Sequence, residues 1–234
     1  SYFKKATKLK PKFAKAYNNI AIALKDLGKL DQAIDNCNIA IKLDQNFFDG
    51  HKNFGNILLK LGKFNEASKS YEKALKIKPG DKIVLHLVSS LYGKTPKTAP
   101  EEYITELFDN YANRFEKHLT EVLKCKIPEK IVILIKKTSK QKLFFKSTID
   151  LGCGTGLSGV VLRPLTEYLV GVDISRQMIE KAKNKNIYDH LETENISIYL
   201  GKSQMKFDLF VFADVFIYIG DLEKIFSQIF LKSD

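Results

Sequence analysis

The feature that most constrains the fold of this chain is a glycine-rich turn that follows a short apolar segment. Residues 148–151 have the composition of a buried strand and include Asp150. Glycines follow at alternating positions, as Gly152, Gly154 and Gly156, and residues 157–165 have the pattern of a helix. Glycine allows positive φ angles and lets a ligand approach where a Cβ atom would collide. In a parallel α/β sheet such a turn forms a cofactor site at the carboxyl end of the first strand, so the turn predicts a domain of this kind.

A second acidic residue indicates that the cofactor contains adenosine. Asp173 follows Gly156 by 17 positions and closes a second predicted strand, residues 168–172. A carboxylate at the end of that strand can accept hydrogen bonds from the two hydroxyls of a ribose. Residues 154–159 also match the G-x-G-x-x-G pattern of dinucleotide sites. In those sites, however, a pyrophosphate lies on the helix N-terminus. The charge of Asp150 would repel a pyrophosphate but could hold an ammonium or sulfonium group.

Three segments in order carry a resemblance to a known family. They are residues 150–156, residues 170–175 with Met178 following, and residues 207–222. Together they resemble successive motifs of class I S-adenosylmethionine-dependent methyltransferases. The resemblance implies a Rossmann-like α/β fold, S-adenosyl-L-methionine as cofactor and methyl transfer as the reaction.

The resemblance also implies roles for the matching residues. Asp150 would attract the amino group of the cofactor, and Asp173 would bind its ribose diol. The turn of Gly152, Cys153, Gly154, Thr155 and Gly156 would approach the methionine and ribose portions. Ile174 and Met178 would pack against adenine, and Asn195, or alternatively Glu194, would accept a hydrogen bond from its amino group. Asp214 would help to bind cofactor or substrate, or would only cap the next helix. No residue is identified as catalytic, and the methyl acceptor is left open.

A helical entry segment is expected before the first strand. Pro100 with Glu101 and Glu102 is a strong helix start. Residues 108–115 resemble the helix that precedes the core in methyltransferases fused to tetratricopeptide repeats. By that resemblance Tyr111 and Arg114 would meet the methionine carboxylate or the substrate, and the alternative is a helix that only packs.

The first part of the chain contains a repeat with a period of 34 residues. Aligning Gly28 with Gly62 superimposes residues 27–33 on residues 61–67 and pairs Ala21 with Gly55 and Cys37 with Tyr71. These are the positions of the tetratricopeptide repeat, a stack of paired helices. Such repeats bind protein segments along their first helices. Lys52 and Asn56, one helical turn apart, could bind a peptide carboxylate or an acidic segment, although a solvated face is the alternative.

Charge and cysteine content exclude several other classes. Residues 1–95 contain 18 Lys and 8 acidic residues, a net charge of +10, and the remaining residues contain 20 basic and 19 acidic residues, a net charge of +1. Nucleic-acid binding is not favoured, because the lysines form no dense block and only three arginines occur. Three cysteines without a metal-ligand spacing predict neither a disulfide nor a metal site. No apolar run is long enough for a membrane span, and no signal peptide is recognised. Together with the absence of a disulfide pattern, this makes a reducing cytoplasm the expected location.

These observations predict a definite domain organisation. Residues 1–94 would form the tetratricopeptide repeats, the first of them incomplete, and residues 95–100 would form a linker. Residues 101–146 would be the helical entry segment, and residues 147–234 an α/β core. Its four parallel strands would lie near 148–151, 169–172, 190–194 and 207–212, the third of them within the segment 188–196. The order usual for this fold would put strand four beside strand one, with strands two and three on its other side. A class I domain continues with further strands, so we expect the chain to be truncated at its C-terminus, which leaves its activity open. The predicted function is methyl transfer, with the repeats recruiting a protein partner or substrate. The alternative is a non-catalytic adaptor with a structural or cofactor-sensing α/β domain.

Overall fold

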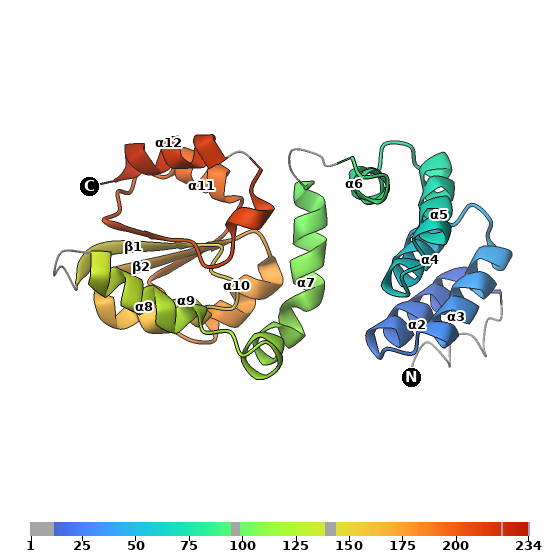
Figure 1. Ribbon diagram of the computed structural model, residues 1–234, viewed down its shortest axis with the longest axis horizontal. Coiled ribbons are helices and arrows are strands. Elements are labelled where there is room, and N and C mark those ends of the chain that lie inside the picture. Colours follow the sequence, from blue (N-terminus) through green and yellow to red (C-terminus); the bar gives the residue numbers. More distant parts are fainter. Residues whose placement is uncertain (1–11, 95–98, 139–143, 221, 234) are drawn as a thin grey trace. The chain divides into compact units, whose positions relative to one another are not determined.

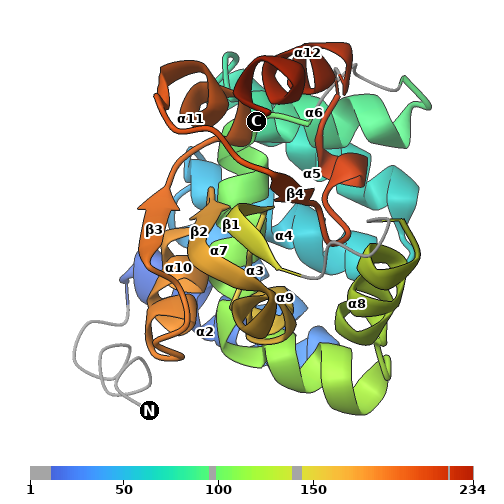
Figure 2. The same ribbon diagram turned by 90° about the vertical axis from the view of Figure 1, so that its left-hand side faces the viewer.

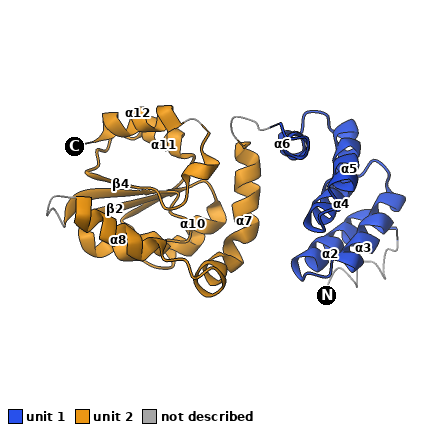
Figure 3. Cartoon of the chain, in the orientation of Figure 1, with its two compact units in different colours: residues 1–96 blue, residues 97–234 orange. Residues whose placement is uncertain are grey.

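The chain folds into two compact units. The computed structural model describes residues 12–94, 99–138, 144–220 and 222–233. Residues 1–96 form one unit, called here the repeat unit, and residues 97–234 form the other, called the α/β unit (Figure 3). Most of the expected linker, at 95–98, lies outside the described residues, as does the start of the first repeat at 1–11.

The described part of the repeat unit is entirely helical. Its helices are α2 (Ala14–Asp26), α3 (Leu30–Leu43), α4 (Phe48–Lys60), α5 (Phe64–Ile77) and α6 (Lys82–Leu91). Gly28 and Gly62 lie at equivalent turns between paired helices with φ angles of 74° and 73°. A residue with a side chain adopts such angles only with strain, so the glycines end α2 and α4 in the same way. The predicted equivalence of the two repeats is therefore confirmed.

Small residues let the paired helices of the repeat unit approach closely. Ala21, Ala33 and Ala67 are completely buried, and so are the larger Cys37 and Tyr71. A Cβ atom at Gly55 on α4 would overlap the ring of Tyr71 on α5. The absence of a side chain at residue 55 therefore creates the space that Tyr71 fills, which explains the pairing of small and aromatic positions in the repeat.

The α/β unit is built on a four-stranded parallel sheet. Its strands are β1 (Phe145–Leu151), β2 (Thr166–Asp173), β3 (His190–Thr193) and β4 (Leu209–Val211), in the order β3-β2-β1-β4. The expected order, with strand four beside strand one, is confirmed. β4 is shorter than the predicted segment of 207–212, because Phe207 instead pairs with Ser233 in an isolated bridge.

Helices cover both faces of the sheet (Figures 1 and 2). One face packs on α8 (Ile127–Thr138) and α9 (Leu157–Leu162), where Ile135 and Leu162 meet Leu169 of β2. The other face packs on α11 (Ile196–Lys202) and α12 (Leu222–Lys232), through a buried cluster that includes Val170 of β2. Successive residues of β2 thus enter opposite cores, which explains why residues 169–172 in the middle of this strand form a continuous apolar run. The predicted fold class, helical repeats followed by a parallel α/β domain, is confirmed.

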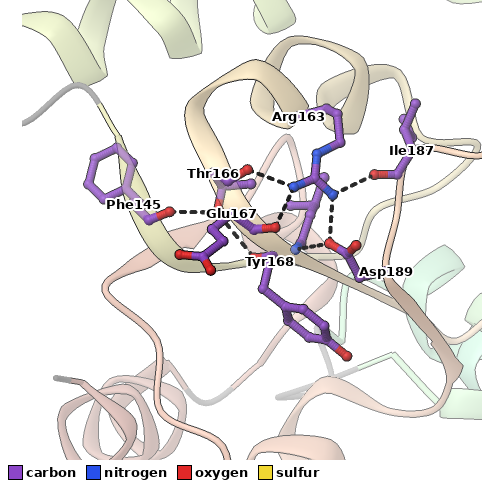
Figure 4. Close-up of polar contacts among 8 residues, drawn as sticks. Phe145, Arg163, Thr166, Glu167, Tyr168, Ile187 and Asp189 are labelled. Atoms are coloured by element: carbon purple, nitrogen blue, oxygen red, sulfur yellow. Dashed lines mark hydrogen bonds and ion pairs between the residues drawn. The ribbon is translucent and has the colours of Figure 1, made fainter.

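Arg163 ties together the amino ends of β2 and β3 (Figure 4). Its guanidinium donates to the carbonyl oxygens of Thr166 and Glu167 at 2.6 and 2.7 Å. It also donates to the carbonyl of Ile187 at 3.2 Å and to Oδ2 of Asp189 at 2.6 Å. The planar fork of the guanidinium suits such a set of acceptors. Residues 187–189, which precede β3, are thereby fixed to the start of β2.

Candidate cofactor site

The glycine turn lies at the carboxyl end of β1. Gly152, Gly154 and Gly156 have φ angles of 76°, 54° and 86°. A Cβ atom at Gly152 would overlap the side chain of Val215, which follows β4. The backbone N–H groups of Gly152 and Cys153 donate to the carbonyl of Val172 at 2.8 and 3.1 Å. The turn is therefore held against the end of β2.

Asp150 is completely buried beneath this turn. Its Oδ2 accepts a hydrogen bond of 2.8 Å from the hydroxyl of Tyr188. Its Oδ1 has no hydrogen-bond partner among the described residues. The pKa of Asp150 is raised from 3.8 to about 7. Burial is the main cause, the hydrogen bond from the Tyr188 hydroxyl opposes the shift, and the nearby charge of Asp173 adds to it. A buried polar atom without a partner is costly in a folded protein, so Oδ1 marks a place where a donor is missing.

Asp173 at the end of β2 binds the turn and the next helix at once. Its Oδ2 accepts from the N–H of Gly154 at 2.9 Å, and its Oδ1 accepts from the N–H of Ser175 at 2.8 Å. Burial raises its pKa to about 6, although both hydrogen bonds oppose the shift. Each carboxylate oxygen can accept more than one hydrogen bond, so ribose hydroxyls could still be accommodated.

Helix α7 (Glu101–Lys117) lies across the same end of the sheet. A Cβ atom added at Gly154 would contact the ring of Phe115 on α7 at 3.6 Å. Asp109 of α7 accepts a hydrogen bond of 2.6 Å from the hydroxyl of Ser175, which caps α10 (Arg176–Lys183). Phe108 packs edge-on against Tyr218, in the segment that follows β4. The entry helix therefore contacts the glycine turn, the start of α10 and the residues after β4.

An open hollow of about 310 Å³ lies between α7, the glycine turn and α10. It is lined by Ala112, Asn113, Glu116, Thr155, Lys181, Asn184 and Lys185. The ammonium of Lys185 pairs with Glu116 at 2.6 Å. The volume of this hollow is at the lower end of the range for small-molecule sites.

Tyr111 and Arg114 lie together on α7. The guanidinium of Arg114 is 5.6 Å from the ring centre of Tyr111, and its side chain is exposed. The hydroxyl of Tyr111 is hydrogen-bonded to Nδ1 of His118, in the π-helical turn η1 (His118–Val122). Neither side chain is among those that line the hollow.

The residues expected to contact adenine differ in their exposure to solvent and in their hydrogen-bond partners. Ile174 is partly exposed directly after Asp173, whereas Met178 is completely buried in α10. Asn195 is the N-cap of α11, and its Oδ1 accepts from the N–H groups of Ser197 and Ile198. Its Nδ2 donates to Glu101 of α7 at 3.1 Å. The side-chain oxygen expected to bind adenine thus already has backbone partners.

The remaining residues of the site lie around the glycine turn and β4. Cys153 and Thr155 are buried within the turn, and burial, together with Asp150 and Asp173, raises the pKa of the Cys153 thiol. Asp214 follows β4, is exposed and has a φ angle of 59°. The 3-10 turn η3 (Phe216–Tyr218) has Val215 as its N-cap and no side-chain cap, so Asp214 does not cap it.

Sequence reasoning missed two residues that organise the site. The sequence predicts only that Tyr188 lies in the segment of the third strand and that Asp109 lies in the entry helix. Tyr188 approaches Asp150 from 38 positions away, and Asp109 approaches Ser175 from 66 positions away. Gly159 and Gly171 leave the space for Tyr188, since a Cβ atom at either would overlap its ring, but the sequence alone does not say which side chain fills that space.

In the repeat unit, Lys52 and Asn56 lie one turn apart on α4, and both are partly buried. Oδ1 of Asn56 accepts a hydrogen bond of 2.7 Å from the hydroxyl of Tyr71. Among the described residues of both units, no group of three or more His, Cys, Asp or Glu side chains could hold a metal ion. Nor is any helix in those parts of the chain long and apolar enough to cross a membrane.

Comparisons with known proteins agree with these two units. A family model described as a methyltransferase domain matches residues 145–232, and the tetratricopeptide repeat model matches residues 14–47 and 48–81.

Curated relatives match only part of this chain. It is 30% identical over 80 residues to small glutamine-rich tetratricopeptide repeat-containing protein 2 of Mycosarcoma maydis, a match that covers 34% of this chain and 23% of that protein. It is 34% identical over 77 residues to human DnaJ homolog subfamily C member 7, covering 33% and 16% of the two chains. The chain therefore spans less than a quarter of the length of either relative.

Among solved structures, an S-adenosylmethionine-dependent methyltransferase from Clostridium acetobutylicum is 27% identical, with a TM-score of 0.45 and coverage of 52% of this chain and 53% of that one. The matches of the family models account for most of both units. The chain carries two tetratricopeptide repeats followed by a domain of the methyltransferase family.

Proposed function

We propose that the α/β unit binds S-adenosyl-L-methionine and transfers its methyl group to an acceptor that the repeats help to recruit. The observation that carries this proposal is the buried Oδ1 of Asp150, which has no hydrogen-bond partner in the part of the chain that the structure describes and lies beneath a turn of three glycines with positive φ. An ammonium group would supply the missing donor, whereas a pyrophosphate would be repelled by the carboxylate. The residues present therefore fit the cofactor.

Each part of the site has a proposed role. Asp150 binds the amino group, Asp173 binds the ribose hydroxyls and the glycine turn follows the cofactor backbone. Ile174 and Met178 contact adenine, and Asn195 contacts its amino group through whichever acceptor capacity its capping bonds leave. Tyr111 and Arg114 bind the methionine carboxylate or the acceptor, and Asp214 borders the acceptor.

The bound cofactor would supply an electrophilic methyl group on a positively charged sulfur. The chain's own contribution is orientation, exclusion of water by α7 and a negative field from Asp150 and Asp173. No general base is assigned, because an acceptor that is already nucleophilic needs only to be positioned.

The repeat unit is proposed to bind a protein partner. Lys52 and Asn56 on α4 would bind a carboxylate or an acidic segment of that partner, with the amide of Asn56 oriented by Tyr71. Because the three cysteines are free thiols, we also propose a reducing, cytoplasmic location. In the alternative function, a non-catalytic adaptor whose α/β unit is only structural, that unit would have no need for a buried carboxylate placed to accept a further hydrogen bond.

Calorimetric titration with S-adenosylhomocysteine tests the proposal, with NAD as the comparison ligand. Asp173→Ala should weaken binding by about 1.5–3 kcal/mol, the value of a hydrogen bond to a charged group. Glu180→Ala, which removes an exposed carboxylate from α10, serves as the matched control and should leave affinity unchanged. Thermal unfolding of each variant checks that it is folded.

The outcomes separate the readings of this site. Preferential binding of NAD would exclude the methyltransferase reading. Unchanged affinity in Asp173→Ala would exclude the ribose assignment alone. Tight binding without methyl transfer to any candidate acceptor would favour the cofactor-sensing adaptor.

A further inference from the structure

The ring of Tyr188 occupies a slot that two glycines leave open. A Cβ atom at Gly159 of α9 or at Gly171 of β2 would overlap this ring. Tyr188 therefore lies between a helix and the sheet, and its hydroxyl reaches Asp150 at the end of β1. An aromatic side chain brings one polar atom into such a position with few rotatable bonds.

The backbone on either side of Tyr188 is fixed independently of the cofactor. Arg163 binds the carbonyl of Ile187 and the carboxylate of Asp189, the two neighbours of Tyr188 (Figure 4). Asp189 is also joined to β2, because its N–H donates to the carbonyl of Leu169 and its Oδ2 accepts from the N–H of Leu169. The hydroxyl of Tyr188 is thus presented to Asp150 from a rigid support.

We propose that Tyr188 is a positioning residue that holds Oδ2 of Asp150 and thereby reserves Oδ1 for the ammonium group of the cofactor's methionine portion. This inference rests on the proposed function. The hydroxyl donates to one oxygen, so the carboxylate plane cannot rotate freely and the second oxygen keeps a fixed direction. The site then recognises a primary ammonium group rather than the nucleoside alone.

The same hydrogen bond acts on the ionisation of Asp150. The ionisable groups that face this carboxyl are Tyr188 before β3, Asp173 on β2 and Cys153 in the turn. Burial and Asp173 raise the pKa of Asp150, and the Tyr188 hydroxyl lowers it. Removing that hydroxyl should raise the pKa further, so less of the ammonium-binding carboxylate form is present at neutral pH.

The test compares two ligands in the full chain by calorimetry. One is S-adenosylhomocysteine, and the other is its deamino analogue, in which hydrogen replaces the amino group. Tyr188→Phe should weaken the first roughly tenfold, as expected for a hydrogen bond to an ionised group, and leave the second unchanged. The matched control is Tyr199→Phe, which removes the hydroxyl of a buried tyrosine on α11 and should alter neither affinity.

A pH series adds a readout that a packing role would not change. Affinity of the unaltered chain for S-adenosylhomocysteine should rise with pH as Asp150 ionises, and in Tyr188→Phe the midpoint of that rise should lie at higher pH. Asp150→Asn supplies a second route that does not depend on the folding of the tyrosine variant. It should abolish the preference for S-adenosylhomocysteine over the deamino analogue.

Each outcome either supports or overturns the positioning role of Tyr188. Equal loss of both ligands in Tyr188→Phe, or no loss of either, would overturn the positioning role while leaving the proposed function in place. A preference for the amino-bearing ligand that survives in Asp150→Asn would also overturn it. Failure of the unaltered chain to bind either ligand would overturn the proposed function itself, and Tyr188 would then be a packing residue.

Discussion

Asp150 near the end of β1 and Asp173 at the end of β2 are both buried, and ionisation of their carboxyl groups destabilises the folded chain. The pKa of Asp150 is raised to about 7 and that of Asp173 to about 6, mainly by burial. Between about pH 4 and 7 the folded chain keeps protons that the unfolded chain has released. The free energy of unfolding therefore falls as pH rises through this window. Such a cost is expected where a site is arranged for a charged ligand.

We therefore expect Asp150→Asn to stabilise the ligand-free chain at pH 8. The gain should be up to about 4 kcal/mol, because each unit of pKa shift corresponds to about 1.4 kcal/mol, and it should vanish towards pH 4. Thermal unfolding across this range measures the gain.

Asp189→Asn is the control, because its effect on the free energy of unfolding should have the opposite sign. The pKa of Asp189 is raised by burial but lowered more by Leu169 N–H and Arg163, so this variant should be destabilised above pH 4. Equal stability of Asp150→Asn and the unaltered chain at pH 8 would contradict the argument.

At the scale of residues, the sequence predicted those parts of the site that are set by a single strand end and the turn after it. The three glycines, Asp150 and Asp173 all follow from the turn after one strand and the end of the next. The contacts of Tyr188 with Asp150 and of Asp109 with Ser175 depend on how distant segments pack, which no local pattern encodes. Asn195 was expected to bind the ligand, and in the structure its side chain also caps a helix.

At the scale of elements, helix periodicity and strand composition predicted the order of the architecture but not every boundary. The apolar run of 207–212 has the composition of an interior strand, yet β4 is confined to Leu209–Val211. Phe207 pairs instead with Ser233 after α12, in an isolated bridge. The N–H of Phe207 donates to the carbonyl of Lys232 at 2.8 Å. A tertiary contact thus set the end of the strand, which propensity alone could not show.

Packing between α4 and α5 gives a prediction that runs against helix propensity. Gly55→Ala should improve helix propensity by about 1 kcal/mol. The added Cβ atom would overlap the ring of Tyr71, which is completely buried and bonded to Asn56. We expect a net loss of about 1–3 kcal/mol, typical of overpacking, measured by urea unfolding of the repeat unit's helical signal.

Gly201→Ala on α11 is the matched control for this prediction. Its added Cβ atom would meet only the side-chain amide of Gln228, at an ordinary contact distance of 3.4 Å. This variant should be stabilised by up to about 0.5 kcal/mol, since propensity is unopposed there. If Gly55→Ala were equally stabilised, the close approach of α4 and α5 would not be what residue 55 provides.

At the scale of the whole molecule, charge and chemistry are divided between the two units. The excess of positive charge belongs to the first part of the chain, while every residue proposed for the cofactor lies in the α/β unit. The repeat unit has its own buried clusters, around Tyr71 and around Cys37, and the α/β unit has clusters on both faces of its sheet. Each unit therefore contains the core that an independent folding domain needs.

This division predicts two separable thermal transitions with different responses to ligand. S-adenosylhomocysteine at 100 times its dissociation constant should stabilise only the unit that binds it, by about 2.7 kcal/mol. For a unit of this size the transition should rise by several degrees, while the other transition stays in place. Differential scanning calorimetry of the full chain measures both. Ala33→Glu, which places a charge in the completely buried core of the repeat unit, should lower only the transition that the ligand does not move. A single transition that both changes shift together would show that the two units unfold as one cooperative unit.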